Sequence, residues 1–205
     1  MDAITILCSR AAPVEFFDRW IADRSMCIAR LTHCEFSHGD YVMQNGDLLG
    51  ASFNPRAPIV LTNPPGDPCG VARRPWNYQR FAVRRIARIP CTEHQKRKFE
   101  HFCLAQLGKP FDSEAIKFKT FLSANFESRK WRNPARWFCY ELLARAMEVS
   151  GVLERPILSV KNRITGGDFL LIINHLIDVE EFWKSDPEAY RPWPDPPMIK
   201  ASSPR

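Results

Sequence analysis

The sequence predicts an α+β domain, in which a small antiparallel sheet packs against separate helices. Short β-branched or alternating runs predict strands in the first half of the chain, and a turn of the Asn-Gly kind joins two of them. Helical spacing of apolar residues is clearest over residues 139–149, in the second half. Apolar residues make up 45% and charged residues 25% of the 205 residues, which is typical of a globular protein with one hydrophobic core.

Four segments have the composition of strands. Residues 4–8 are short, apolar and β-branched, and predict a buried strand. Residues 37–43 and 48–53 flank the turn at 44–47 and predict a hairpin. Residues 80–89 alternate in part between apolar and polar side chains, and predict a further strand of the same sheet.

Helical spacing recurs in several segments, of which 92–107 has the clearest start signal. Thr92 and Gln95 form the Thr-x-x-Gln pattern of a capping box, and Gly108 ends the periodic run. The other predicted helices cover residues 14–22, 26–31, 139–149 and about 167–175.

The chain is predicted to be a single domain over residues 1–180, followed by a Pro-rich tail over 181–205. Its 17 prolines cluster in two places, one of them in this tail. The other cluster lies within residues 54–77, which show no period and predict a long surface loop.

The net charge of +6 lies partly in short basic runs, which we interpret as solvated surface. No nucleic-acid-binding motif accompanies the charge, so the sequence disfavours nucleic acid as a partner. The seven cysteines are odd in number and include no Cys-x-x-Cys pair, which disfavours a disulfide framework and a zinc site. We therefore expect reduced thiols, a cytoplasmic location and no cofactor. The apolar run 3–8 is too short for a signal segment, and no stretch approaches the ~20 apolar residues of a membrane span.

Cys139 and His38 are the candidate reactive pair. Cys139 begins the predicted helix 139–149, and a helix N-terminus or an adjacent imidazolium lowers the pKa of a thiol. Backbone N–H groups there can also hold the oxyanion of a tetrahedral intermediate. His38 lies at the start of the predicted strand 37–43, directly after a serine, and can project from there toward such a helix. The alternatives are a buried structural cysteine and a half-exposed strand histidine. The other histidines are His33, in an unplaced connection, His94 and His101 on a polar helix, and His175 at a helix end.

Five blocks of sequence resemble the circularly permuted papain-like enzymes of the NlpC superfamily, of the YiiX/YaeF type found in phages and prophages. Residues 31–42 contain Phe-Ser-His-Gly-Asp, similar to the family's aromatic-Ser-His-x-acid segment. Residues 137–142 read Trp-Phe-Cys-Tyr-Glu-Leu, similar to its Trp-aromatic-Cys-Ser-Glu-Leu segment. The remaining blocks are 46–52, 70–74 and 107–112. Together they cover roughly residues 3 to 175 in the family's order, with the histidine before the cysteine.

The resemblance implies a thiol-dependent hydrolase (amidase, peptidase or esterase) or an acyltransferase. Cys139 would form a thioester acyl-enzyme and His38 would act as general base. The implied substrates are acyl, amide or peptide compounds, including lipid-like and cell-wall-derived ones, and a phage-encoded protein in the host cytosol fits the type. We expect Cys139 to be reached through a cleft, with Tyr140 narrowing the acyl pocket. Aromatic residues between Phe111 and Phe138 either line an acyl groove or fill the core.

The chain departs from the family at position 50. Many members place a polar residue there to orient the histidine, but Gly50 has no side chain. Asp40 is two residues from His38 and on the same strand face, so it is the favoured substitute, and Ser52 on the partner strand is the alternative. The departure also leaves open a catalytically inactive binding module of the same fold.

Overall fold

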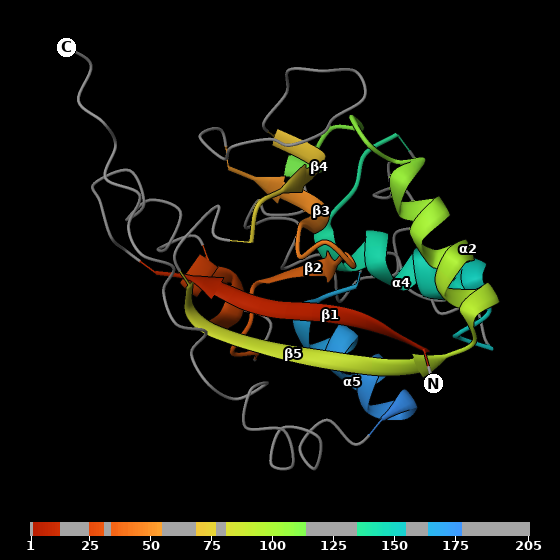
Figure 1. Cartoon of the computed structure of the whole chain (residues 1–205). Coiled ribbons are helices and arrows are strands. Elements are labelled where there is room, and N and C mark those ends of the chain that lie inside the picture. Colours follow the sequence, from red (N-terminus) through yellow and green to blue (C-terminus); the bar gives the residue numbers. More distant parts are fainter. Residues whose placement is uncertain are drawn as a thin grey trace.

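The computed structural model describes residues 2–12, 25–30, 34–54, 69–76, 81–113, 135–154 and 164–177 (Figure 1). Within these ranges it is an α+β structure whose strands form one antiparallel sheet, so the predicted class is confirmed. The predicted helix 14–22 and the tail 181–205 lie outside these ranges.

The sheet has five strands in the spatial order β4-β3-β2-β1-β5. They are β1 (Asp2–Ala11), β2 (His38–Val42), β3 (Leu48–Phe53), β4 (Cys69–Arg74) and β5 (Phe81–Cys91). The N-terminal strand β1 pairs with β2 on one side and with β5 on the other, so it lies inside the sheet (Figure 1). All four strands predicted from the sequence are present.

The hairpin of β2 and β3 sets the positions of the candidate site residues. Its turn contains Gly46 at φ 87°, a backbone conformation that glycine adopts without a steric cost. The strands pair with Tyr41 opposite Leu49. Continuing this antiparallel register by one residue sets Asp40 opposite Gly50, because opposed residues change by one in opposite directions.

Strand β4 corrects the prediction of a long surface loop over residues 54–77 at residues 69–74, whereas residues 55–68 and 77 lie outside the described ranges. Its sequence carries two arginines and shows no alternation, but it pairs along its whole length with β3. The Arg74 side chain is buried and donates hydrogen bonds to the carbonyls of Gly50 and Gly70, each at 3.0 Å. Tertiary pairing therefore decides the structure here, and a propensity reading cannot detect it.

The three longer helices begin close to the predicted residues. Helix α2 (Glu93–Leu104) has the predicted capping box, in which Thr92 and Gln95 bond each other's backbone N–H groups. Helix α4 (Cys139–Ser150) begins at the candidate nucleophile. Helix α5 (Gly166–Leu176) has a second capping box, formed by its N-cap residue Thr165 with Asp168. Residues 25–30 form a short helix, close to the predicted 26–31.

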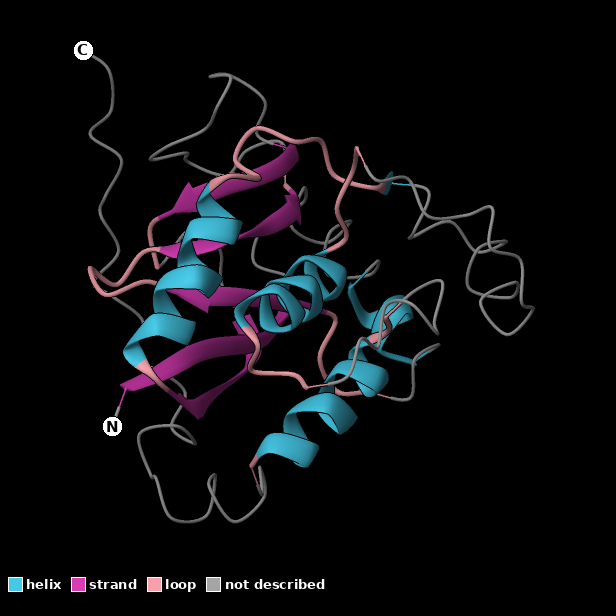
Figure 2. Ribbon diagram, turned by 90° about the vertical axis from the view of Figure 1, so that its right-hand side faces the viewer, coloured by secondary structure: helices cyan, strands magenta, loops and turns pink. Residues whose placement is uncertain are grey.

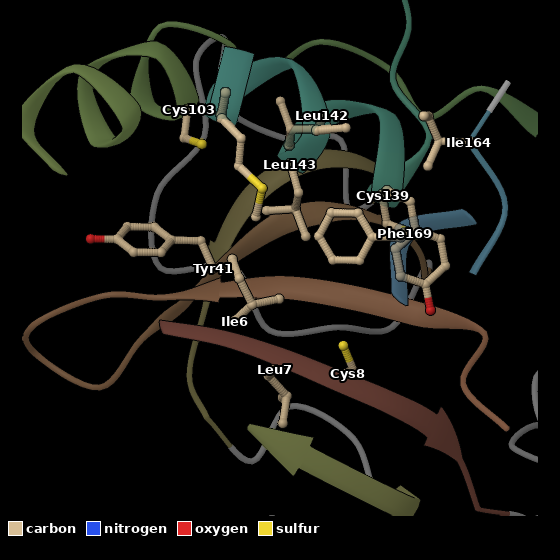
Figure 3. Close-up of a cluster of buried hydrophobic side chains, with 14 of the residues drawn as sticks. Ile6, Leu7, Cys8, Tyr41, Cys103, Cys139, Leu142, Leu143, Ile164 and Phe169 are labelled. Atoms are coloured by element: carbon tan, nitrogen blue, oxygen red, sulfur yellow. The ribbon is translucent and has the colours of Figure 1, made fainter. Parts of the chain in front are cut away.

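The core lies between the sheet and these helices, with α4 between α2 and α5 (Figure 2). Helix α4 packs against β2 and β3. On β1, Ile6 and Cys8 point toward α4, whereas Leu7 points to the opposite side (Figure 3). This alternation is the period of a strand, and all three side chains are buried.

Candidate active site

Cys139 is the first residue of α4, as the sequence predicts. The residue before it, Phe138, has extended backbone geometry and no side-chain hydrogen bond that caps the helix. The first intrahelical bond runs from the Leu142 N–H to the Phe138 carbonyl at 3.0 Å. A helix leaves its first N–H groups without intrahelical acceptors, and the positive end of its dipole favours an anion. The local structure around Cys139 is therefore suited to a thiolate and to an oxyanion.

His38 and Asp40 lie on the same strand and contact each other directly. His38 Nε2 is 3.0 Å from Asp40 Oδ2, and the two side chains are 14% and 1% exposed. No bridging water is needed, although the spacing of alternate residues on a strand is ~7 Å. Continuing the same register sets Ser52, the alternative partner, opposite His38, but Asp40 makes the direct contact with the ring at 3.0 Å. The contact thus favours Asp40 as the residue that orients the ring.

Cys139 and Asp40 both affect the ionisation of His38. Burial acts to lower the pKa of the ring, but the Asp40 carboxylate and then Cys139 outweigh burial and raise the pKa from 6.5 to about 10. Asp40 acts on the ring by its charge at 3.0 Å, and Cys139 acts on it in the same direction. Because Nε2 faces Asp40, Nδ1 is the ring nitrogen available to the thiol. The structure thus brings Cys139, His38 and Asp40 together, with the ring as an imidazolium at neutral pH.

Gly50 lies against the Asp40 carboxylate. An ideal Cβ built on Gly50 would be 2.0 Å from Asp40 Oδ1 and 3.1 Å from its Cγ. The first distance is far below any van der Waals contact, so the carboxylate occupies the space that a side chain at position 50 would fill. Gly50 is the position at which the sequence departs from the pattern that it resembles. The space left by its missing side chain is occupied by the Asp40 carboxylate.

Gly39, between His38 and Asp40, is a residue that the sequence analysis missed. A Cβ on Gly39 would be 2.9 Å from the Tyr140 ring and 3.1 Å from a methyl of Leu143. Glycine therefore lets α4 approach β2 closely. The available signal is a glycine inside a strand, which often marks a close approach of another segment.

Two expectations about access to the site are wrong. Cys139 is only 1% exposed, so its sulfur is enclosed and is not open to a cleft. Tyr140 does not narrow an acyl pocket, because its ring packs in the core against Phe138 and Phe169, at 5.9 and 5.1 Å between centroids. Phe138 and Phe111 are also buried core residues, which favours the core interpretation for the described aromatic residues.

The remaining candidates are distinguished by burial and ionisation. All seven cysteines are free, and Cys27 is the exposed one. Burial raises the pKa of Cys8, Cys34 and Cys103, so these three thiols stay protonated near neutral pH. His94, His101 and His175 are exposed, and His33 lies outside the described residues.

Comparison with protein-family models, with curated protein sequences and with solved structures found no match for the chain. Among the residues with a described structure, no group of His, Cys, Asp and Glu side chains could hold a metal ion. No helix in the same part of the chain is long and apolar enough to cross a membrane.

The raised pKa of His38 predicts that the folded protein loses stability as the pH rises. The folded state holds a proton on His38 up to about pH 10, whereas the unfolded chain releases it near 6.5. The stabilising contribution is therefore complete below pH 6.5 and declines as the pH rises through 10. The free energy of unfolding, measured in urea, should fall between about pH 6.5 and 8.5, and Asp40→Asn should flatten this dependence. If the unfolding free energy changed equally with pH in the wild-type and Asp40→Asn proteins, the result would contradict the interaction between His38 and Asp40.

Proposed function

We propose that the chain is a cysteine hydrolase or acyltransferase, with Cys139 as the nucleophile and His38 as its acid–base partner. The observation that carries this proposal is the contact of the His38 ring with the Asp40 carboxylate, together with the effect of Cys139, the first residue of α4, on the ionisation of that ring. A cysteine, its base and a carboxylate that orients the base are the parts of a thiol acyl-transfer site. Acyl, amide and peptide compounds are the proposed substrates.

The proposed reaction has two steps. In the first, the Cys139 thiolate attacks the substrate carbonyl, and the N–H groups at the start of α4 hold the oxyanion. The His38 imidazolium gives its proton to the leaving amine or alcohol, and a thioester forms on Cys139. In the second step, neutral His38 takes a proton from water, or from an acceptor amine or alcohol, as this attacks the thioester. The tetrahedral intermediate collapses, which frees the acyl product and restores the thiolate and the imidazolium.

The proposed fold is the circularly permuted papain-like one of the NlpC superfamily. Two features support it: the histidine strand β2 precedes the nucleophile helix α4 in the chain, and α4 packs against β2 and β3. The free cysteines support a reducing compartment such as the cytoplasm.

An inactive binding module of the same fold is the second candidate. The burial of Cys139 favours it, because a substrate carbonyl can reach the sulfur only after covering groups move aside. Gly50 no longer favours it, since the Asp40 carboxylate fills the space beside that residue.

A screen of activated esters, amides and short peptides, each with and without an added amine or alcohol, separates the candidates. We expect turnover of at least one class by the wild-type protein and none by Cys139→Ala. Product that contains the added amine or alcohol would identify an acyltransferase, and free acid would identify a hydrolase. Saturable binding of a substrate without turnover would support the binding module.

A further inference from the structure

Asp40 is enclosed on both sides by neighbouring strands. On one side it pairs with Leu7 of β1, which is fully buried. On the other side lies Gly50 of β3, whose ideal Cβ would be 2.0 Å from Asp40 Oδ1 and 3.3 Å from the Gly39 carbonyl oxygen. Asp40 is itself 1% exposed, so the carboxylate cannot move out into solvent without losing its place beside the His38 ring.

A side chain at position 50 would clash with the side chain of Asp40, which is short and has few ways to move aside. Asp40 has two side-chain torsions, and its Oδ2 is already fixed 3.0 Å from His38 Nε2. Real Cβ atoms essentially never approach another heavy atom within 3.0 Å, so a methyl group at position 50 must displace either the carboxylate or strand β3. Displacement of the carboxylate lengthens the contact between Asp40 and His38, and it is the expected response because strand β3 is held by its pairing with β2 and β4.

We propose that Gly50 is a positioning residue: its empty side-chain space admits the Asp40 carboxylate, so that positions 40 and 50 are mutually exclusive sources of the group that orients His38. The inference concerns how the proposed site is built. Only the statement that the orientation of His38 serves catalysis rests on the proposed function. It implies that β2 or β3 can supply the carboxylate, but not both strands at once.

The pKa of His38 in the protein without substrate tests this proposal, and NMR titration of the histidine ring protons measures it. Among the described residues, the titratable groups that act on the ring are Asp40 on its own strand and Cys139 on α4. Gly50→Ala should lower the pKa of His38 by about 1–3 units, as expected when an opposite charge is moved away. Ser52→Ala, the matched control on the same strand and face, should leave the pKa within a few tenths of a unit.

Two double variants separate positioning from general damage to the fold. Gly50→Ala alone should lower the midpoint of thermal unfolding, because its methyl group clashes with the carboxylate. Asp40→Ala/Gly50→Ala removes the carboxylate and fills its space with that methyl group. The midpoint should therefore largely recover in the double variant, while the pKa of His38 stays low. Asp40→Ala/Gly50→Asp supplies the carboxylate from β3 and should restore most of the raised pKa.

An unchanged pKa in Gly50→Ala would overturn the proposal. So would failure of Asp40→Ala/Gly50→Ala to recover stability, because the two positions would then not compete for one space. These readouts need no substrate. A protein that shows them without turnover would contradict the proposed function and leave the positioning role of Gly50 standing.

Discussion

Replacing Cys139 with alanine should abolish acyl transfer, with a loss of at least ~10³-fold in kcat/KM. The sulfur is the only atom of the residue that can form the proposed thioester, and no other thiol shares its contact with His38 among the described residues. The protein should still fold, because alanine fits the buried site and is a good helix former. Steady-state kinetics on the best substrate of the screen, with circular dichroism as a fold check, measures both effects.

Cys103→Ala is the matched control for this loss. Cys103 is a fully buried thiol on α2, and burial raises its pKa. Its replacement should cost stability, by roughly 1–2 kcal/mol for a small buried group, while kcat/KM stays within about twofold. Comparable losses of activity in the two variants would mean that the effect of Cys139→Ala comes from the core and not from chemistry.

Replacing His38 with glutamine should reduce kcat by about 10²–10⁴-fold, the usual contribution of a general acid–base group. In the wild-type protein, activity should also decline as the pH rises through about 10, where the imidazolium loses its proton and can no longer protonate a leaving group. The glutamine variant should lack this alkaline limb. The pH profile of kcat between about pH 6 and 10.5 measures the limb.

His101→Gln is the control for the histidine prediction. His101 is exposed on α2, so its replacement should leave both kcat and the alkaline limb unchanged. An alkaline limb that persists in His38→Gln would assign the limb to another group and would contradict the role of His38.

Elements with a local signal could be predicted from the sequence. The hairpin carries its turn at Asn45 and Gly46, and α2 and α5 carry capping boxes, so their boundaries follow from short-range hydrogen bonding. Strand β4 has no such signal, because its pairing with β3 and the bonds of Arg74 to backbone carbonyls form only in the folded protein. Non-local pairing of this kind cannot be read from a short window of sequence.

The candidate site divides in the same way. The start of α4 at Cys139 sets the proposed nucleophile at a helix end, and the period of β2 sets Asp40 on the same face as His38. Both features follow from local patterns. The role of Gly50 does not follow from a local pattern. The sequence shows only that position 50 has no side chain, and its contact with Asp40 depends on the pairing of β3 with β2. The burial of Cys139 also depends on the packing of segments distant in sequence.

Trapping the acyl-enzyme tests the central claim most directly. The protein would be mixed with an activated acyl ester, quenched in acid, digested and analysed by peptide mass spectrometry, with the Cys139→Ala and His38→Gln variants in parallel. We expect one acyl group on the peptide that contains Cys139, released by hydroxylamine, absent from Cys139→Ala and formed far more slowly in His38→Gln. Acylation confined to the exposed Cys27, or equal rates in the wild-type and His38→Gln proteins, would contradict the assignment of Cys139 and His38 as a catalytic pair.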